Sequence, residues 1–468
     1  MASIDEALSS FSDGISECAR SGGTVMVTTH MDCDGIASGG IMAKALSRAG
    51  AKYSVSAVGG LGPEEAKMLG GSAHDLHVIM DLGSGVSAEL DELKGGWFVL
   101  DHHPVSDDEN PRVVNAWKFG IDGGSEASAG TMAYLAACAI GEDNTDLAPC
   151  ALVSALGDRQ DSGEKRSFTG KNQEIALAAK ERGLVEIDLD LLLAGRETRP
   201  LPDALAFTTQ PFIEGLTWNR PACLSLLEST GIKLKEGGRW RVPSELVEDE
   251  KRKLISAVTK FATGSDDGEL GGSLIGHTYT FPEEDRMGLL RDAREYSTML
   301  NSCGRIGMAG AGMAVCMGDR NIMLEECEGI LERYRTMTKE YMAILSSERW
   351  RISDGKECIM VNGEGVVPES MTGTISSIIA GSPRSSGKIV ILRAEGGSGT
   401  VKFSSRKSFS CTSGVNLRDL MMGAERFEGA GGGHAAAAGA RITKDKLDVF
   451  LDYLEANVSN VQGQGNPA

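Results

Sequence analysis

The chain has 468 residues, of which 41% are hydrophobic and 24% are charged, and this composition excludes disordered and fibrous proteins. A chain of this length can form two or three domains that each bury a core, so we expect more than one. The formal net charge is −19, which argues against a protein that coats nucleic acid nonspecifically, because contacts to phosphate need clustered Lys and Arg.

The sequence also argues against membrane insertion and export. No apolar run approaches the ~20 residues that a membrane helix needs. Residues 1–20 lack the basic start and apolar stretch of a secretory signal. The ten cysteines are scattered without a Cys-x-x-Cys pair, so we expect free thiols. Together these features predict a cytoplasmic protein with no membrane partner.

The first part of the chain alternates β-rich runs with helical stretches, which is typical of a parallel sheet covered by helices. Strands are predicted at 24–29, 53–58, 77–80 and 97–100. Between the first two strands, residues 36–49 place apolar side chains on one helical face. This pattern predicts a strand-helix-strand unit with a right-handed crossover.

Beyond residue 161 the strand pattern fades and helices dominate. Helices are predicted at 171–184, 244–261, 285–301 and 323–347. Strands return at 357–366 and 388–402, and a glycine-rich turn precedes a last helix at 444–456.

These elements indicate an α/β protein in four parts. We expect an α/β catalytic domain with a parallel sheet at 1–194, a mainly helical middle region at 195–347, a smaller α/β domain at 348–457 and a disordered tail at 458–468. Residues 384–418 contain seven Lys or Arg and one acidic residue. This segment is therefore the best electrostatic candidate for contact with nucleic acid.

Metal-capable side chains follow three of the four predicted strands. They are His30, Asp32 and Asp34 after the first strand, Asp81 after the third, and Asp101, His102 and His103 after the fourth; Asp158 ends an apolar helix. The carboxyl ends of parallel strands share one edge of a sheet, where ligands bind. We therefore expect these side chains to lie close together.

Each motif taken alone also has a structural interpretation. A single Asp after a strand, such as Asp81, is commonly a helix cap or a turn residue. Asp32 and Asp34 can likewise cap the helix that begins near residue 36. The adjacent His102 and His103 are harder to explain in this way, because a surface turn has no need of two imidazoles.

Four or more carboxylates at one sheet edge repel one another unless cations neutralise them, which indicates bound divalent metal. Carboxylates with one or two imidazoles suit Mn²⁺ or Mg²⁺ better than Zn²⁺. We expect two Mn²⁺ ions, with Mg²⁺ as the alternative. Two ions ~3.5 to 4 Å apart can polarise a phosphoryl oxygen and stabilise a leaving oxygen. The predicted reaction is hydrolysis of a phosphate ester.

The four motifs together resemble those of the DHH phosphoesterase family, which is named after the tripeptide found here at 101–103. Residues 431–439 (GGGHAAAAG) resemble the signature of its glycine-rich accessory (DHHA1-like) domain, and residues 402–406 (KFSSR) resemble a strand that contacts nucleic acid. Residues 300–305 (LNSCGR) resemble a segment of RecJ-type proteins. Because the chain stops soon after the glycine-rich domain, it is most similar to archaeal RecJ-like single-strand nucleases of the GINS-associated nuclease type.

The resemblance implies a role for each of these side chains. Asp81 would bridge two metals, of which one also binds His30 and Asp32 and the other Asp34, His102 and Asp158. His103 would face the scissile phosphate, and Asp101 would orient the imidazoles. Substrate contacts would come from Arg305, Ser404, Arg406, Gly431, Gly432, Gly433 and His434. Glycine N–H groups can approach a phosphate closely, although a glycine run can also be a flexible loop.

We therefore expect a metal-dependent exonuclease that hydrolyses single-stranded DNA or RNA held between the catalytic and accessory domains. The resemblance also implies docking on GINS or another replisome protein through the middle region, and a role in DNA replication or repair. Two alternatives stay open, namely a hydrolase of short oligonucleotides or cyclic dinucleotides and a catalytically silent scaffold of the replication fork. Residues able to bind metal fill every matched position, which argues against the scaffold alone.

Overall fold

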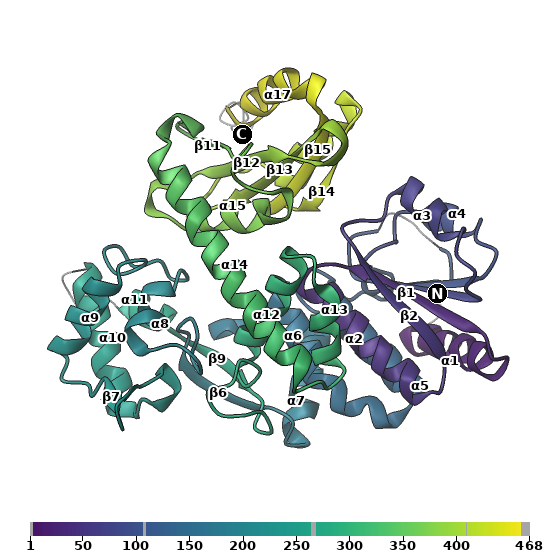
Figure 1. The fold of residues 1–468 in the computed structure, drawn as a ribbon, viewed down its shortest axis with the longest axis horizontal. Helices are drawn as coiled ribbons and strands as arrows, with labels where there is room; N and C mark the ends of the chain where they lie inside the picture. The colour runs from purple at the N-terminus through teal and green to yellow at the C-terminus, as the bar shows by residue number, and fades with distance from the viewer. Residues whose placement is uncertain (1–2, 106–108, 264–267, 409, 460–468) are drawn as a thin grey trace, which may run out of the picture. The chain divides into compact units, whose positions relative to one another are not determined.

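The structure is a computed structural model that describes residues 3–105, 109–263, 268–408 and 410–459 (Figure 1). Its contacts divide the chain into two compact units, which are Met1–Phe207 with Asn219–Glu332 and Thr208–Trp218 with Arg333–Ala468. Helix α14 (Ile322–Ser347) begins in the first unit and ends in the second. The four-part division drawn from the sequence stays a prediction.

The first unit is built on a five-stranded sheet in the order β2-β1-β3-β4-β5, in which all neighbours are parallel. The strands are β1 (Thr24–His30), β2 (Lys52–Val58), β3 (Leu76–Met80), β4 (Gly96–Asp101) and β5 (Val113–Asn115). The first four were predicted, whereas β5 has only three residues and is too short to show alternation. Every residue of the central strand β3 is buried, as expected for a strand covered on both faces.

Helices cover both faces of this sheet, which confirms the predicted α/β class. Successive side chains of a strand point to opposite faces. Trp97 and Val99 of β4 share a hydrophobic core with Leu90 of α4 (Ser87–Leu90). Between them, Phe98 meets Phe11 of α1 (Ile4–Arg20) edge to face, with ring centroids 5.3 Å apart.

The helices that flank the candidate site form one group. Figure 1 shows α2 (Cys33–Arg48) beside α5 (Ala129–Ile140) and α6 (Ala148–Gly157), and α2 also packs on β1. The predicted helix at 36–49 corresponds to α2. On the other face lies α3 (Pro63–Leu69), whose Ala66 joins the core around Trp97.

The region after α7 (Gly170–Glu181) combines helices with strands that the sequence did not reveal. β6 (Glu186–Leu191) pairs antiparallel with β9 (Ile275–Thr280). Between them lie α8 (Leu201–Phe207), α9 (Arg220–Ser229), β7 (Lys235–Glu236), β8 (Arg239–Trp240), α10 (Glu248–Thr263) and α11 (Gly268–Ser273). Because β6 and β9 are stabilised by a partner far away in the chain, a local pattern does not identify them.

The helix predicted at 285–301 begins later than expected. It is α12 (Ala293–Arg305), and α13 (Ala309–Cys316) follows it. Asp292 is the N-cap, since its side chain accepts hydrogen bonds from the backbone N–H groups of Arg294 and Glu295 at 2.9 and 3.1 Å. This cap stops the helix from extending toward residue 285.

The second unit contains a six-stranded mixed sheet in the order β10-β11-β12-β13-β15-β14. Its strands are β10 (Ile352–Asp354), β11 (Cys358–Asn362), β12 (Ile389–Glu395), β13 (Thr400–Lys407), β14 (Ala430–His434) and β15 (Ala437–Thr443). The strand pattern predicted over 388–402 corresponds to β12 and the start of β13, and residues 397–399 form a turn between these two strands. The glycines of this turn break the extended backbone.

Two cores sandwich this second sheet. Val390 and Leu392 pack with Ile375 of α15 (Thr372–Ala380) on one face. Phe403 and Phe450 pack on the other face, together with residues of α16 (Leu417–Met422) and α17 (Leu447–Ser459). Helix α17 includes the first two residues of the predicted tail, and the remainder, 460–468, lies outside the described residues.

The glycine run is an edge strand and not the turn that the sequence suggested. Gly431, Gly432 and Gly433 lie in β14, which pairs with β15. A Cβ atom on Gly431 would lie 2.0 Å from the backbone oxygen of Met421 in α16. The missing side chain therefore lets the strand approach this helix closely.

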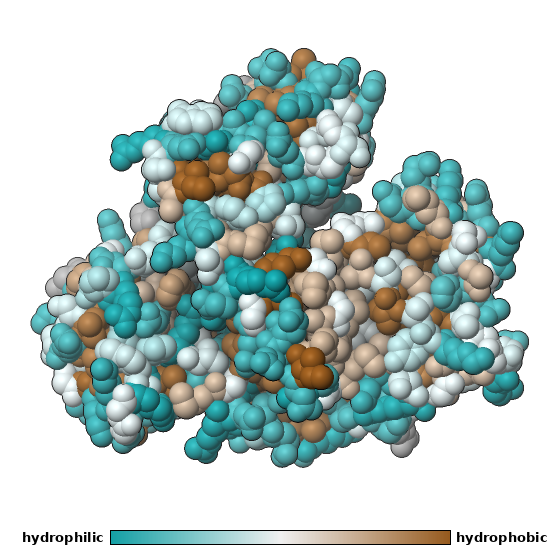
Figure 2. Space-filling model, viewed as in Figure 1, coloured by the Kyte–Doolittle hydropathy of each residue, from teal (hydrophilic) through white to brown (hydrophobic). Residues whose placement is uncertain are grey.

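The surface shown in Figure 2 is mostly hydrophilic, with small scattered hydrophobic patches. Among the residues that the structure describes, no helix combines the length and apolarity needed to cross a membrane.

Candidate metal centre

The first candidate motif lies where β1 ends and α2 begins. Asp32 is the N-cap of α2, and its Oδ1 accepts a hydrogen bond from the N–H of Gly35 at 3.1 Å. Its other oxygen, Oδ2, lies 3.0 Å from Nδ1 of His30. The capping interpretation of Asp32 is thus confirmed. It leaves one carboxylate oxygen facing the sheet edge.

The segment 300–305 holds this loop from outside the sheet. The side-chain oxygen of Asn301 accepts a hydrogen bond from the N–H of Cys33 at 3.2 Å. A Cβ atom on Gly304 would lie only 1.6 Å from the backbone oxygen of Met31, so α12 touches the loop backbone directly. Although burial opposes ionisation, the charges of His30 and Arg305 keep the pKa of Asp32 well below its usual range.

Asp81 follows β3 and lies at the centre of the cluster. Its backbone is in the left-handed region (φ 61°), and its N–H donates to the carbonyl of Leu100 at 3.0 Å. Oδ1 of Asp81 is 3.2 Å from Nε2 of His102, and Oδ2 is 3.5 Å from Nδ1 of His30. Among the described residues, Oδ2 has no hydrogen-bond partner although it is buried. A buried carboxylate oxygen without a donor is costly unless a cation binds it.

His102 is oriented by the backbone. Its Nδ1 lies 2.6 Å from the carbonyl oxygen of Gly123, which can only accept, so Nδ1 carries the hydrogen. Nε2 then faces the carboxylates of Asp81 and Asp34, at 3.2 and 3.3 Å. In the neutral imidazole this nitrogen presents its lone pair, which is the form that binds metal.

Asp34 has a second role that the sequence did not indicate. It is buried, and its two oxygens accept hydrogen bonds from the N–H groups of Ala129 and Gly130 at 2.9 Å, at the start of α5. The hydroxyl of Ser154 also bonds to it. Burial and the charge of Asp81 raise the pKa of Asp34 to about 7. In the absence of a cation, the neighbouring carboxylates therefore disfavour the ionised form of Asp34.

Asp158 follows α6 and faces the same cluster, with Oδ2 3.8 Å from Nδ1 of His102. The side-chain amide of the buried Gln160 donates to Oδ2 of Asp158 at 3.0 Å and to the carbonyl of Gly123 at 2.9 Å. Its oxygen accepts from the side chain of Asn172 at 2.7 Å. Sequence reasoning missed Gln160 and Asn172, because an amide carries no recognisable metal-binding signal.

Asp101 and His103 complete the sheet edge. Oδ1 of Asp101 lies 2.8 Å from Nδ1 of His103 and also accepts the N–H groups of His102 and His103. Burial opposes protonation of His103, but the charge of Asp101 outweighs it and raises the pKa of the imidazole to about 9. Asp101 thus holds the half-exposed ring of His103 through Nδ1.

The structure thus brings all eight predicted side chains to one sheet edge. They form three groups whose ligand atoms lie within 4.8 Å of one another, which are Asp81 with Asp101, His102 and His103; His30 with Asp32 and Asp81; and Asp34 with His102 and Asp158. Asp81 and His102 each belong to two groups. Carboxylates that outnumber imidazoles, together with the unsatisfied oxygen of Asp81, fit hard divalent cations.

The predicted substrate residues are distributed over both units. Arg305 lies in the first unit beside Asp32. Arg406 and Ser404 lie on β13 of the second unit, where Nε of Arg406 donates to the hydroxyl of Ser377 at 3.1 Å and the buried hydroxyl of Ser404 lies 3.1 Å from that of Ser376. The remaining four, Gly431, Gly432, Gly433 and His434, form β14. Ser404 therefore contributes to packing on α15.

Comparison with protein families identifies two domains. The DHH-CID domain matches residues 193–267, and the DHHA1 domain matches residues 361–460. The uncharacterized protein MJ0831 of Methanocaldococcus jannaschii is 30% identical over 442 residues, which cover 92% of this chain and 93% of that protein. The similarity therefore extends over nearly the full length of both chains.

Solved structures share the fold at low identity. RecJ from Thermus thermophilus in complex with Mn²⁺ matches 99% of this chain with a TM-score of 0.59 and 17% identity, and this chain spans 55% of that RecJ. An exonuclease RecJ bound to manganese matches with a TM-score of 0.57 and 18% identity, and the match covers 97% of this chain and 94% of that one. CDC45 from Entamoeba histolytica matches with a TM-score of 0.64 and 11% identity, and the match covers 97% of this chain and 99% of that one. On the family domains and the full-length relative, this chain belongs to the DHH family of RecJ-like proteins.

Proposed function

We propose that this protein is a metal-dependent phosphodiesterase that removes nucleotides from single-stranded DNA or RNA. The observation that carries the proposal is the centre around Asp81, whose buried Oδ2 has no hydrogen-bond donor among the described residues while three groups of potential ligands surround it. A carboxylate cluster of this kind requires cations. Phosphate-ester hydrolysis is the chemistry that paired divalent cations support at such a site.

We propose that Asp81 is shared by the two cations. One cation would also bind His30 and Asp32, which form a group with Asp81, and the other would also bind Asp34, His102 and Asp158, which form a separate group. We favour Mn²⁺, with Mg²⁺ as the alternative, and the two RecJ structures described above contain manganese. When bound, the cations supply positive charge that offsets the carboxylates and stabilises negative charge on the phosphoryl oxygens.

The chain's own residues then orient the substrate and move protons. His103, whose ring is oriented by Asp101 through Nδ1, would donate a hydrogen bond to a phosphoryl oxygen or a proton to the leaving oxygen. Gly123 fixes His102 in the form that binds metal. Arg305 and, on the second unit, Arg406 and β14 would bind phosphates of the strand. Only 5% of the residues are aromatic, so we do not expect sequence-specific reading of bases.

The decisive experiment measures release of mononucleotides from end-labelled single-stranded and duplex DNA and RNA, each with Mn²⁺, Mg²⁺ or EDTA. We expect metal-dependent loss of single strands by the wild type and none by Asp81→Asn or His102→Ala. Asp13→Asn is the matched control, since Asp13 is an exposed carboxylate on α1. Normal turnover by either variant of the centre would contradict the proposal.

Short oligonucleotides and cyclic dinucleotides belong in the same assay. If only these are cleaved, the enzyme is a hydrolase of small nucleotides and not a processive nuclease. If nothing is cleaved under any metal condition, a silent scaffold becomes the better interpretation. The fold shared with CDC45 favours keeping that alternative.

We further infer a cytoplasmic protein that docks on GINS or another replisome protein through the middle region. Exposed hydrophobic side chains in this part of the chain include Phe207, Val247 and Phe261, and all three lie within the match to the DHH-CID domain. Exposed apolar side chains are typical anchors of protein interfaces. Loss of GINS binding in Val247→Asp, with nuclease activity retained, would support this partner surface.

A further inference from the structure

A second functional feature lies next to the candidate ligand Asp158. Arg159 has its backbone in the left-handed region, with φ of 59°. This conformation is unfavourable for a residue with a long side chain, and it persists only where the surroundings impose it. Seven other described non-glycine residues share such a backbone, and Asp81 at the centre of the cluster is one of them. Strained residues of this kind are concentrated at functional sites.

The neighbours of Arg159 explain how the strain is maintained. Its N–H donates to the carbonyl of Leu156 at 3.1 Å, and the N–H of Gln160 donates to that of Ala155 at 2.9 Å. The side chain of Gln160 is buried and bonded to Asp158 and Gly123. The residues on both sides of Arg159 are therefore held in place at the centre. Their contacts fix the backbone of Arg159 and so the direction in which its side chain leaves the backbone.

The guanidinium of Arg159 has no structural role that the fold requires. Two nearby arginines, Arg166 and Arg294, both bind the carboxylate of Asp161, at 2.9 and 2.8 Å. Arg159 is exposed, and within the described part of the chain it makes neither a side-chain hydrogen bond nor an ion pair. The strained backbone thus holds an exposed guanidinium, without an ion pair among the described residues, at the position that directly follows Asp158.

The surroundings favour an anionic ligand. Arg166 lies close enough to repel the Arg159 guanidinium, while the carboxylates of Asp161 and Asp158 attract it. Arginine stays charged in proteins. Its planar fork binds two oxygens of a phosphate at once. An incoming phosphate would relieve the repulsion between these two cations.

We propose that Arg159 is a substrate-binding residue whose guanidinium binds the non-bridging oxygens of a strand phosphate beside the centre. The inference rests on the proposed function for the nature of the substrate. Three consecutive residues would then have different roles. Asp158 is a candidate metal ligand, Arg159 contacts a phosphate, and the side-chain amide of Gln160 holds this segment in place. Because glycine readily adopts the positive φ of Arg159, a substitution to glycine can test this role without disturbing the backbone.

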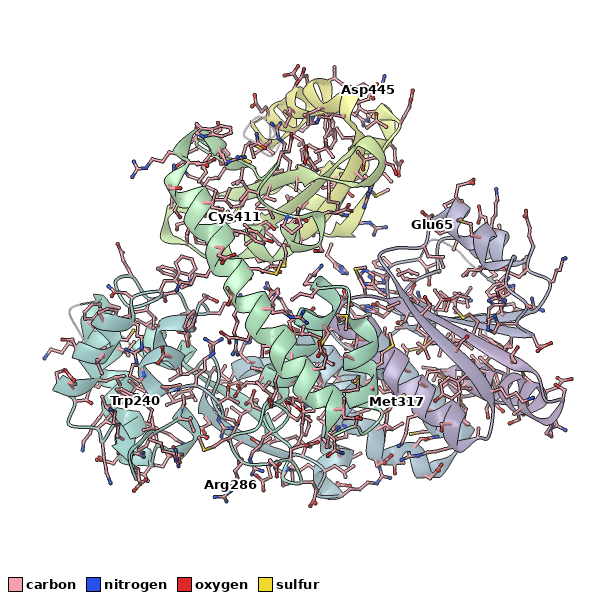
Figure 3. The ribbon with its side chains drawn as sticks, in the orientation of Figure 1. Glu65, Trp240, Arg286, Met317, Cys411 and Asp445 are labelled. Carbon is pink, nitrogen blue, oxygen red and sulfur yellow. The ribbon has the colours of Figure 1, made fainter. Side chains whose placement is uncertain are left out.

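Arg159→Gly removes the guanidinium and keeps the backbone, because glycine adopts positive φ without strain. Arg159→Lys keeps the charge and loses the fork. Arg286→Gly is the matched control, since Arg286 is another exposed arginine of the first unit without a side-chain hydrogen bond or ion pair among the described residues. Figure 3 shows its side chain projecting from the edge of that unit.

Binding of fluorescent single-stranded DNA should be measured by anisotropy in full-length protein carrying Asp81→Asn, so that no strand is consumed. We expect Arg159→Gly to weaken binding by about 10- to 100-fold, the range of a charge-assisted hydrogen bond. The slope of log K against log salt should fall by about 0.7, as for one phosphate on a single strand. Arg159→Lys should lie between, and Arg286→Gly should match the parent.

Turnover gives a second readout. In the otherwise wild-type protein, Arg159→Gly should lose activity that added guanidinium or methylguanidinium ions partly restore, which a purely structural role would not allow. Unchanged affinity and salt slope in Arg159→Gly would overturn the inference, as would a parent that binds no strand. Failure of the proposed function is read separately, from absence of turnover by the wild type.

Discussion

Replacing Gly304 by Ala tests how the RecJ-type segment supports the metal centre. A Cβ atom at this position would lie 1.6 Å from the backbone oxygen of Met31, whereas ordinary contact begins at 3.4 Å. The helix and the loop must therefore separate by about 1.8 Å, the difference between these two distances. The loop that moves carries His30 and Asp32.

The magnitude follows from two opposing effects. Ala is favoured over Gly in a helix by about 1 kcal/mol, while forcing atoms into a packed contact costs about 1 to 3 kcal/mol or more. Because the overlap is with backbone, the cost lies at the upper end of this range, and we expect net destabilisation of about 2 kcal/mol, which lowers Tm by a few degrees. Because displacement of a catalytic group by about 1 Å can cost 10²-fold, kcat/KM should fall by about that factor.

Gly310→Ala is the matched control for this experiment. Gly310 lies in α13, the next helix along the chain, and no atom lies within 4 Å of the position that its Cβ would occupy. This variant should therefore be as stable as the wild type or slightly more so. Thermal unfolding and nuclease assays of the two variants would refute the reasoning if Gly304→Ala behaved like Gly310→Ala.

Three other predictions concern pH, positioning and metal. Burial and the charge of Asp292 raise the pKa of Glu295 to about 7, so the folded state holds a proton that the unfolded state loses above about pH 4.5. The free energy of unfolding should therefore fall by about 3 kcal/mol between pH 4.5 and 8. A plot of Tm against pH for Glu295→Gln should lack that part of the decline. Gln160→Leu leaves Asp158 without its amide donor, and Mn²⁺ titration should show about 10-fold weaker binding, with unchanged affinity contradicting the role. Mn²⁺ at 100 times its Kd should stabilise the wild type by about 2.7 kcal/mol, and an equal Tm increase in Asp81→Asn would argue that the ion binds elsewhere.

Much of the fold could be predicted from local pattern. Four of the five strands of the first sheet, the helix α2 and the long helix α14 were found, because apolar periodicity over several residues is a local property of the sequence. The pattern was insufficient where the partner decides the structure. The strands β6 and β9 form a two-stranded sheet with each other, and β14 is a strand although it contains three consecutive glycines.

The motifs alone identified the side chains that meet at the candidate centre. Asp81 and the tripeptide at 101–103 follow strands of one parallel sheet, and topology brings the carboxyl ends of such strands to one edge. The way in which these side chains are held depends instead on tertiary contacts. Gly123 selects the form of His102, and Gln160 holds Asp158. Gly123 is 21 residues from His102 and 37 residues from Gln160 and contacts both, so their geometry depends on packing that no local pattern encodes.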